Sequence, residues 1–288
     1  MLDQAAKLRQ MAWENNIKEE NNSEYTKVFT IASGKGGVGK SNLVINLAIA
    51  LRKLGKNILV LDADIGMANV DVLIGTIPKY TIFDVIYRGK TIEEVMINGP
   101  LGVKVLCGGT GLSKIDDLDK FQRDLLIKEL GSLRGFDYIL IDTGAGINRT
   151  SLAFIDCSDE IILVTTPEPT ALTDAYSLLK TLYNYNVKSN AKVIVNRVLE
   201  LQEGLNTFKR LQNSAWRFLN TELTHIGNIS EDKKLVQAVR MQKPVILAFP
   251  KSDASRDIAK IAESLEGTKG VAGKNLQGIF KKMLKIFS

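Results

Sequence analysis

The chain has 288 residues, of which 45% are hydrophobic and 24% charged, ordinary values for a globular protein with a sizeable core. No run approaches the roughly 18 apolar residues of a transmembrane helix, and the polar N-terminus lacks the apolar core of a signal peptide. The two isolated cysteines, Cys107 and Cys157, argue against a disulfide framework or a C-x-x-C metal site. These features predict a cytoplasmic protein.

The net charge of +6 is unevenly distributed. Residues 1–27 carry four basic and five acidic side chains, whereas residues 268–288 carry five lysines and no acidic residue. The body between them is nearly neutral. A nucleic-acid-binding body is expected to be basic, so we expect no sequence-specific nucleic acid as a partner.

Residues 1–27 precede the first strand-like run. Residues 3–13 predict a short helix with Asp3 as its N-cap, and residues 15–25 predict a polar linker. A helix this short is marginal in water by itself. We therefore expect it to become ordered by packing either on its own domain or on a partner.

A phosphate-binding loop is predicted between an apolar strand at 28–33 and a helix at 42–51. The intervening residues fit the pattern G-x-x-x-x-G-K-[ST], in which glycines let backbone N–H groups approach a phosphate and the helix directs its positive end at it. Lys40 would neutralise the β- and γ-phosphates, and the Ser41 hydroxyl would ligate magnesium. A chance glycine-rich turn is the alternative, disfavoured by the complete strand–loop–helix context. The expected phosphate-binding residues are Gly34, Lys35, Gly36, Gly37, Val38, Gly39, Lys40, Ser41 and Asn42.

Strand-like and helical runs alternate through residues 28–267. The near-continuous Ile, Leu and Val content of the strand-like runs is typical of strands that are buried on both faces. The pattern predicts one α/β domain with a doubly wound, mostly parallel sheet and helices on both faces. The predicted strands are 28–33, 57–62, 103–107, 137–142, 160–166, 191–196 and 225–229, and predicted helices include 118–133, 170–183, 205–219 and 232–241.

Aspartates follow two of these strands. Asp62 and Asp64 close the second strand, and Asp142 closes the run 137–142 in the Walker B arrangement, which holds magnesium through water. In an open α/β sheet such positions face the ligand crevice. Aspartates that merely terminate strands are the alternative, which the neighbouring phosphate loop disfavours because hydrolysis needs a group to orient water.

Lys35 is an additional lysine in the loop, and with it the sequence K-G-G-x-x-K-[ST] resembles the deviant Walker A motif of the MinD/ParA family of P-loop NTPases (SIMIBI class). An exposed lysine without a role is the alternative. The resemblance implies an ATPase that uses ATP and Mg²⁺ and whose two protomers sandwich two nucleotides, with Lys35 reaching the partner's phosphates. Residues 62–69 resemble the family's first switch, which implies that Asp64 positions the attacking water and that Asp62 lies near the magnesium ion.

Other segments resemble the family with departures. Gly144 stands where the second switch more often has proline, and Ser230 stands where relatives usually have proline. The second switch has no cysteine, which disfavours an iron–sulfur cluster. Asn196 and Arg197 fall where the family contacts adenine, and the preference for adenine rests on the resemblance and on the absence of an N-K-x-D motif.

The C-terminal segment 268–288 predicts an amphipathic helix that lies on an anionic membrane surface. A terminal helix docked on the core is the alternative. Two such helices in a nucleotide-closed dimer would gain avidity for the inner face of the cell membrane. The expected membrane residues are Leu276, Ile279, Phe280, Met283, Leu284 and Phe287 on the apolar face, with Lys281, Lys282 and Lys285 towards the other.

Residues 3–9 resemble the D-Q-A-x-x-L-R motif of the flagellar-number regulators within this family, called FlhG, YlxH or FleN. The resemblance implies control of flagellar number and placement, stimulation of an FlhF-type GTPase through Gln4, and contact with flagellar C-ring proteins. A MinD-type cell-division positioner, a ParA-type DNA-segregation ATPase and a nucleotide-binding scaffold without turnover remain alternatives. The expected partner-activating residues are Asp3, Gln4, Ala5, Leu8 and Arg9.

Overall fold

The computed structural model describes residues 26–64, 70–109, 117–187, 191–267 and 276–285. Its strands are β1 (Lys27–Ala32), β2 (Ile58–Ala63), β3 (Ile97–Asn98), β4 (Lys104–Cys107), β5 (Tyr138–Thr143), β6 (Glu160–Thr165), β7 (Ala191–Val198) and β8 (Leu223–Ser230). Its helices are α2 (Lys40–Lys53), α3 (Val70–Ile74), α4 (Ile82–Arg88), α5 (Ile92–Val95), α6 (Lys120–Gly131), α7 (Arg149–Cys157), α8 (Pro169–Asn184), α9 (Leu201–Leu219), α10 (Lys233–Arg240), α11 (Val245–Ala248), α12 (Asp253–Gly267) and α13 (Leu276–Lys285). A short 3-10 turn spans Pro100–Gly102.

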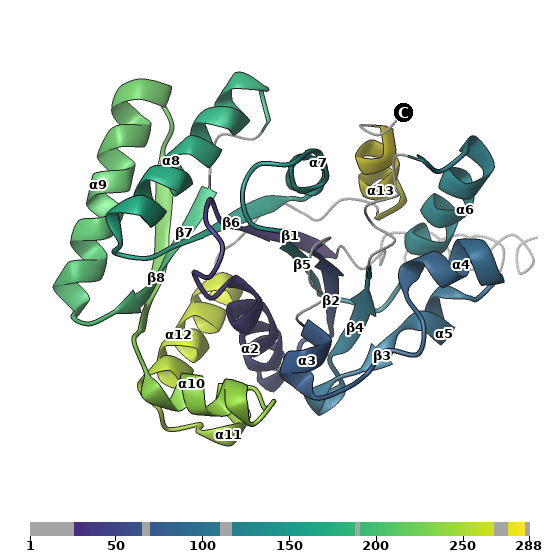
Figure 1. Cartoon of the computed structure of the whole chain (residues 1–288), viewed down its shortest axis with the longest axis horizontal. Helices are drawn as coiled ribbons and strands as arrows, with labels where there is room; N and C mark the ends of the chain where they lie inside the picture. The colour runs from purple at the N-terminus through teal and green to yellow at the C-terminus, as the bar shows by residue number, and fades with distance from the viewer. Residues whose placement is uncertain (1–25, 65–69, 110–116, 188–190, 268–275, 286–288) are drawn as a thin grey trace, which may run out of the picture.

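The strands form one eight-stranded sheet in the order β3-β4-β2-β5-β1-β6-β7-β8, with helices on both faces (Figure 1). Neighbouring strands are parallel except for β3, which pairs antiparallel with β4 at one edge. This confirms the predicted doubly wound, mostly parallel fold. Each of the seven predicted strands is present, with ends shifted by one or two residues.

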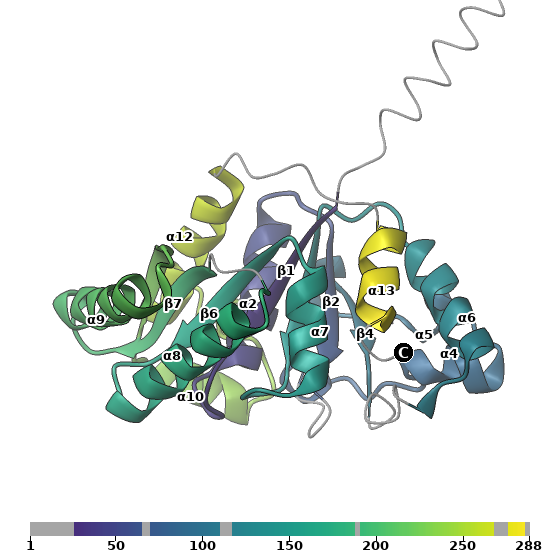
Figure 2. The ribbon, with the colours of Figure 1, turned by 90° about the horizontal axis from the view of Figure 1, so that it is seen from above.

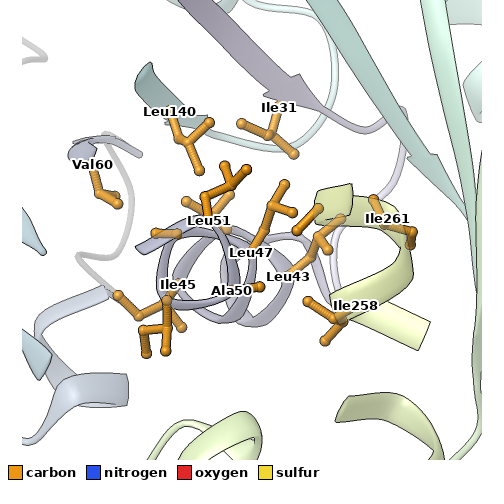
Figure 3. Close-up of a cluster of buried hydrophobic side chains, with 14 of the residues drawn as sticks. Ile31, Leu43, Ile45, Leu47, Ala50, Leu51, Val60, Leu140, Ile258 and Ile261 are labelled. Carbon is orange, nitrogen blue, oxygen red and sulfur yellow. The ribbon is translucent and has the colours of Figure 1, made fainter. Parts of the chain in front are cut away.

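Alternate side chains of the central strands enter cores on opposite faces of the sheet, as the two-residue period of a strand requires. In β5, Leu140 belongs to one core and Ile141 to the other. On the first face the apolar stripe of α2, including Leu47, packs with Ile258 of α12 (Figure 3). On the second face α6, α7 and α13 lie together (Figure 2).

The parallel strands bring their carboxyl ends to one side of the molecule. The loops after β1, β2, β5, β7 and β8 therefore meet there, in the position where open α/β sheets bind their ligands. This arrangement gathers the phosphate loop and the predicted aspartates, which are far apart in the sequence.

Candidate functional site

The loop between β1 and α2 needs glycine for conformational and steric reasons. Gly37 and Gly39 have φ values of +78° and +93°, in the left-handed region that L side chains rarely adopt. A Cβ on Gly34 would lie 2.1 Å from the carbonyl oxygen of Asp174 in α8. The loop therefore turns with its backbone close to α8, and the helix that follows begins at Lys40, as a phosphate-binding loop requires.

Lys40 and Asp142 form a buried ion pair at the centre of the site. The Lys40 Nζ atom lies 2.5 Å from Asp142 Oδ1, and the two side chains are 7% and 0% exposed. Burial raises the pKa of Asp142, and the attraction of Lys40 opposes that rise. Asp142 Oδ2 is buried without a hydrogen-bond partner among the described residues.

This unpartnered carboxylate oxygen fits a hydrated magnesium ion. Magnesium prefers oxygen ligands and keeps several of its waters, which would donate hydrogen bonds to a buried carboxylate. Ser41, the first residue after Lys40, would supply a hydroxyl ligand. Ser41 lies in the first turn of α2 and Asp142 near the end of β5, and their role as magnesium ligands stays a prediction.

Asp62 lies beside Asp142, because the two residues are register partners in the β2–β5 pair. Its carboxylate accepts hydrogen bonds from the backbone N–H groups of Asp64 (3.2 Å) and Val70 (3.4 Å). Burial, with the nearby charge of Asp142, raises the pKa of Asp62 to about 7. Asp62 therefore contacts both Asp64, just after β2, and Val70, the first residue of α3.

Asp64 lines an open cavity of about 620 Å³ in front of the phosphate loop. A Cβ placed on Gly144 would lie 3.3 Å from Asp64 Oδ1, so the Asp64 carboxylate packs closely against the loop after β5. The small residue at 144 leaves room for this contact. The other residues that line the cavity are Ser33, Lys35, Gly36, Gly37, Val38, Gly39, Lys40, Ser41, Asn42, Val72, Leu73, Ala145, Arg197 and Val239.

A second cleft adjoins this cavity and shares Gly39, Asn42 and Arg197 with it. Its far wall is the loop 230–232 after β8. If the predicted nucleotide binds here, the larger cavity would take its phosphates and this cleft its base, so we call them the phosphate cavity and the base cleft. The remaining lining residues are Leu43, Asn196, Ile229, Leu235, Val236 and Ile258.

Asn196 supports the phosphate loop in this structure. Its Nδ2 atom donates a hydrogen bond to the Val38 carbonyl oxygen (2.7 Å), and its Oδ1 atom accepts one from the Arg197 N–H (2.9 Å). A Cβ on Gly39 would lie 2.3 Å from Asn196 Nδ2. Sequence reasoning missed this bracing role, and the adenine contact of Asn196 and Arg197 stays a prediction.

Lys35 is held within its own chain. Its Nζ atom lies 3.0 Å from Glu168 Oε2 and 2.9 Å from Thr170 Oγ1, at the start of α8. The hydrogen bond and charge of Lys35 lower the pKa of Glu168. The side chain of Lys35 is 38% exposed and lies at the cavity rim. Its contact with Glu168 was not predicted from the sequence.

The helix α13 packs between α6 and α7. Leu276, Ile279 and Phe280 are 5%, 2% and 0% exposed. The Lys282 Nζ atom lies 2.9 Å from Asp156 Oδ2 and 3.0 Å from its backbone oxygen. The amphipathic pattern favours a helix on a membrane surface. In the structure α13 is instead docked on the core, with Leu276, Ile279 and Phe280 covered, which is the alternative considered above.

Several predicted residues lie outside the described part of the chain. These are the partner-activating residues Asp3, Gln4, Ala5, Leu8 and Arg9, together with Phe287 and the side chains of Met283, Leu284 and Lys285. Among the described helices, none is long and apolar enough to cross a membrane.

Residues 26–195 match a family model described as an AAA domain. Curated relatives include the antiactivator FleN of Pseudomonas aeruginosa, 36% identical over 87% of this chain and 90% of FleN. The flagellum site-determining protein YlxH of Helicobacter pylori is 35% identical over 99% of both chains. The septum site-determining protein MinD of Synechocystis is 31% identical over 84% of this chain and 90% of MinD.

Solved structures give the same result. The MinC:MinD cell division complex of Aquifex aeolicus matches with a TM-score of 0.67 and 30% identity, over 87% of this chain and 99% of that chain. MinD of Pyrococcus horikoshii, complexed with Mg-ADP, matches with a TM-score of 0.69 and 25% identity, over 86% and 99%. Fold, phosphate loop and relatives agree that the chain belongs to the MinD/ParA family of P-loop ATPases, alongside FleN and YlxH.

Proposed function

We propose that the protein is a nucleotide switch that regulates the number or placement of flagella. In this proposal it binds ATP with Mg²⁺, forms a homodimer around the nucleotides, and associates with the inner face of the cell membrane. The observation that carries the proposal is the position of Lys35, Lys40 and Asp64 around one open cavity. The names of FleN and YlxH, which match most of the chain, support the flagellar role.

The residues that line the cavity, together with Asp142 buried behind it, would divide the chemistry of ATP hydrolysis among them. Ser41 and Asp142 would hold the magnesium ion, which supplies charge neutralisation to the phosphates. Lys40 would exchange its ion pair with Asp142 for the phosphate oxygens. Asp64 lines the cavity and, in this proposal, orients the attacking water.

Exposed apolar residues around the two cavities support a second copy of the chain as the partner. Val72 and Val239 line the phosphate cavity and are 52% and 37% exposed, and Val236 lines the adjoining cleft and is 46% exposed. Apolar side chains that gather around a ligand site favour an interface there. In a two-fold dimer this surface would meet its own copy.

Closure of the dimer requires Lys35 to leave Glu168. Changing Glu168 to glutamine removes the charge that holds Lys35 and should lower the protein concentration needed for the ATP-bound dimer by roughly two- to fivefold, a small effect because the pair is exposed. Sizing at several protein concentrations with ATP measures this. The exposed Glu222→Gln is a matched control, and a dimer that is weaker in Glu168→Gln than in the control would contradict the proposed competition.

A route from the nucleotide to α13 runs through α7. Asn148 caps α7 by accepting a hydrogen bond from the Ser151 N–H (2.7 Å), and the Ser151 hydroxyl donates to the Gly144 carbonyl oxygen (3.4 Å). At the other end of α7, Asp156 holds Lys282 of α13. We propose that a shift of the loop after β5 on ATP binding moves α7, loosens α13 and frees its apolar face for lipid.

Residues 1–27 are proposed to act on an FlhF-type GTPase, and the same protein to contact flagellar C-ring components. These partners rest on the motif with Gln4 alone. Deleting residues 1–25, which keeps the buried Thr26 and the whole of β1, separates the two activities, since ATP turnover should persist while stimulation of the GTPase is lost. The proposed division into residues 1–27, 28–267 and 268–288 depends on the same experiment and on removal of the C-terminal segment.

The switch is tested with ADP, with ATP and with a non-hydrolysable ATP analogue, by sizing and by co-sedimentation with anionic liposomes. Lys40→Ala should weaken ATP binding by roughly a hundredfold or more, because it removes a buried cation that faces the phosphates. Lys209→Ala, an exposed change on α9, is the control. A wild-type protein that stays monomeric and unbound to liposomes with every nucleotide would overturn the proposal.

The cellular role is tested by complementing a null strain with wild type and with Lys40→Ala. We expect an altered flagellar count that only the wild type restores. Misplaced division septa with normal flagella would instead support the MinD-type alternative.

A further inference from the structure

We infer that Asp257 of α12 positions the loop 230–232 and thereby sets the affinity of the site for the nucleotide base. The inference rests on the proposed nucleotide function. It assigns a positioning role to Asp257, which does not line the phosphate cavity. Asp257 is half-buried and does not line the base cleft, although its neighbour Ile258 does. Its effect on nucleotide would therefore pass through the loop.

Asp257 accepts two hydrogen bonds from one residue of that loop. Its Oδ2 atom lies 3.0 Å from the Ser230 backbone nitrogen and 2.6 Å from the Ser230 hydroxyl oxygen. Both donors of Ser230 thus converge on a single carboxylate oxygen. Hydrogen bonds to an ionised group are the stronger ones, so this carboxylate fixes the start of the loop.

At the other end of the loop the roles are reversed: the loop supplies the carboxylate and α12 supplies the N–H donor. Asp232 accepts hydrogen bonds from the backbone N–H groups of Lys234 (2.7 Å) and Ala254 (3.2 Å), the latter in the first turn of α12. Glu231 between them donates its N–H to the Val198 carbonyl oxygen (2.9 Å). The loop and α12 therefore hold each other through one carboxylate from each side.

This clamp fixes the base cleft relative to the phosphate loop. The helix α12 packs on α2, where Ile258 and Ile261 meet Leu43 (Figure 3). The helix α2 begins at Lys40 of the phosphate site. The helix α12 therefore links the loop 230–232, which lines the base cleft, to the helix that would contact the phosphates. Without the Asp257 carboxylate, the loop 230–232 would still pack against the same elements, but its position relative to the phosphate loop would no longer be fixed.

Loss of Asp257 should not unfold this region, because a cavity of about 330 Å³ lies behind the loop. Ser230 and Asp257 both line it, together with the polar side chains of Asn228 and Lys260. Water can enter a cavity of this size and, beside these polar groups of its mixed lining, satisfy the Ser230 donors. The expected consequence of the loss is a displaced loop in a folded protein.

Proline at position 230 gives a way to separate positioning from stability. The Ser230 N–H donates to Asp257 and not to β7, so proline would remove no hydrogen bond of the sheet ladder. Proline lacks both the backbone N–H and the hydroxyl group that donate hydrogen bonds to Asp257 in the wild type. In the Ser230→Pro background, Asp257 has no bond left to make with residue 230.

The test measures binding of N-methylanthraniloyl-ADP and its displacement by ATP and by inorganic tripolyphosphate. Asp257→Ala should weaken ATP roughly five- to tenfold and raise the KM for ATP with kcat unchanged, while tripolyphosphate, which has no base, should compete as in wild type. Asp257→Asn should restore part of the affinity. Asp253→Ala, an exposed carboxylate on the same helix that pairs with Arg256, is the matched control.

The double variant decides the inference. Asp257→Ala should have no effect on ATP affinity in the Ser230→Pro background, and thermal unfolding of each variant shows whether it is folded. Three results would overturn the inference. Asp257→Ala could weaken ATP equally in the wild-type and Ser230→Pro backgrounds, it could weaken ATP and tripolyphosphate equally, or it could leave ATP affinity unchanged. Failure of the wild type to bind the labelled ADP would instead refute the proposed function.

Discussion

Changing Asp64 to asparagine is expected to slow ATP hydrolysis by roughly 10²–10⁴-fold while ATP still binds. Asp64 lines the phosphate cavity, whereas the neighbouring carboxylates Asp62 and Asp142 are buried at the strand ends and do not line it. Asparagine has nearly the same shape but cannot accept a proton or orient water as a carboxylate does. Phosphate release under saturating ATP measures the effect.

The same variant should accumulate as an ATP-bound dimer, because nucleotide that is not hydrolysed keeps the two copies together. Asp71→Asn on α3 is a suitable control, since Asp71 does not line the cavity. Turnover at the wild-type rate in Asp64→Asn would assign the orientation of water to another group. A monomer under saturating ATP would separate dimer formation from hydrolysis.

Removing residues 274–288 should lower binding to anionic liposomes by roughly a hundredfold or more. The segment carries the apolar face of α13 and four lysines, and each lysine near an anionic surface contributes about 1 kcal/mol. A second variant, with Lys281 and Lys285 changed to glutamine, keeps the buried contacts of Leu276, Ile279 and Phe280 and should also bind less. Unchanged sedimentation of both variants would refute the anchor.

A substitution at Gly131 tests the opposite change, in which α13 is kept but displaced from the core. A Cβ on this last residue of α6 would lie 2.9 Å from Gln277 Cβ and 3.1 Å from its Cα, so α13 docks here by backbone approach. Gly131→Leu should displace α13 and allow liposome binding without ATP. Gly267→Leu, at a glycine with nothing within 4 Å of an added Cβ, is the matched control.

The sheet, and the gathering of the phosphate loop and the aspartates at one edge of it, could be predicted from the sequence because both depend on local patterns. Strands buried on both faces are continuous apolar runs, and the two-residue β3, with its exposed Asn98, has no such pattern. Lys40 begins α2, Asp64 follows β2, and Asp142 is the second-last residue of β5. The topology of a parallel sheet then brings them together without any information about distant contacts.

The contacts between distant segments could not be predicted in the same way. Nothing local indicates that Asn196 braces Val38, or that Glu168 holds Lys35, since each pair is more than a hundred residues apart. The amphipathic pattern of α13 correctly identified Leu276, Ile279 and Phe280, its described apolar residues, as one buried face. An apolar face, however, fits a lipid surface and a groove between two helices equally well, so its docking on α6 and α7 required the structure.

The internal ion pair between Lys40 and Asp142 has a thermodynamic consequence for how the site is filled. Each charge of the pair has its counter-charge within the chain, so removing either charge would leave the other unpaired in a region shielded from solvent. A metal cation alone would isolate the ammonium, and a metal-free polyphosphate would isolate the carboxylate. Only a metal–polyphosphate complex replaces both at once, so cation and nucleotide should enter and leave with strong positive cooperativity.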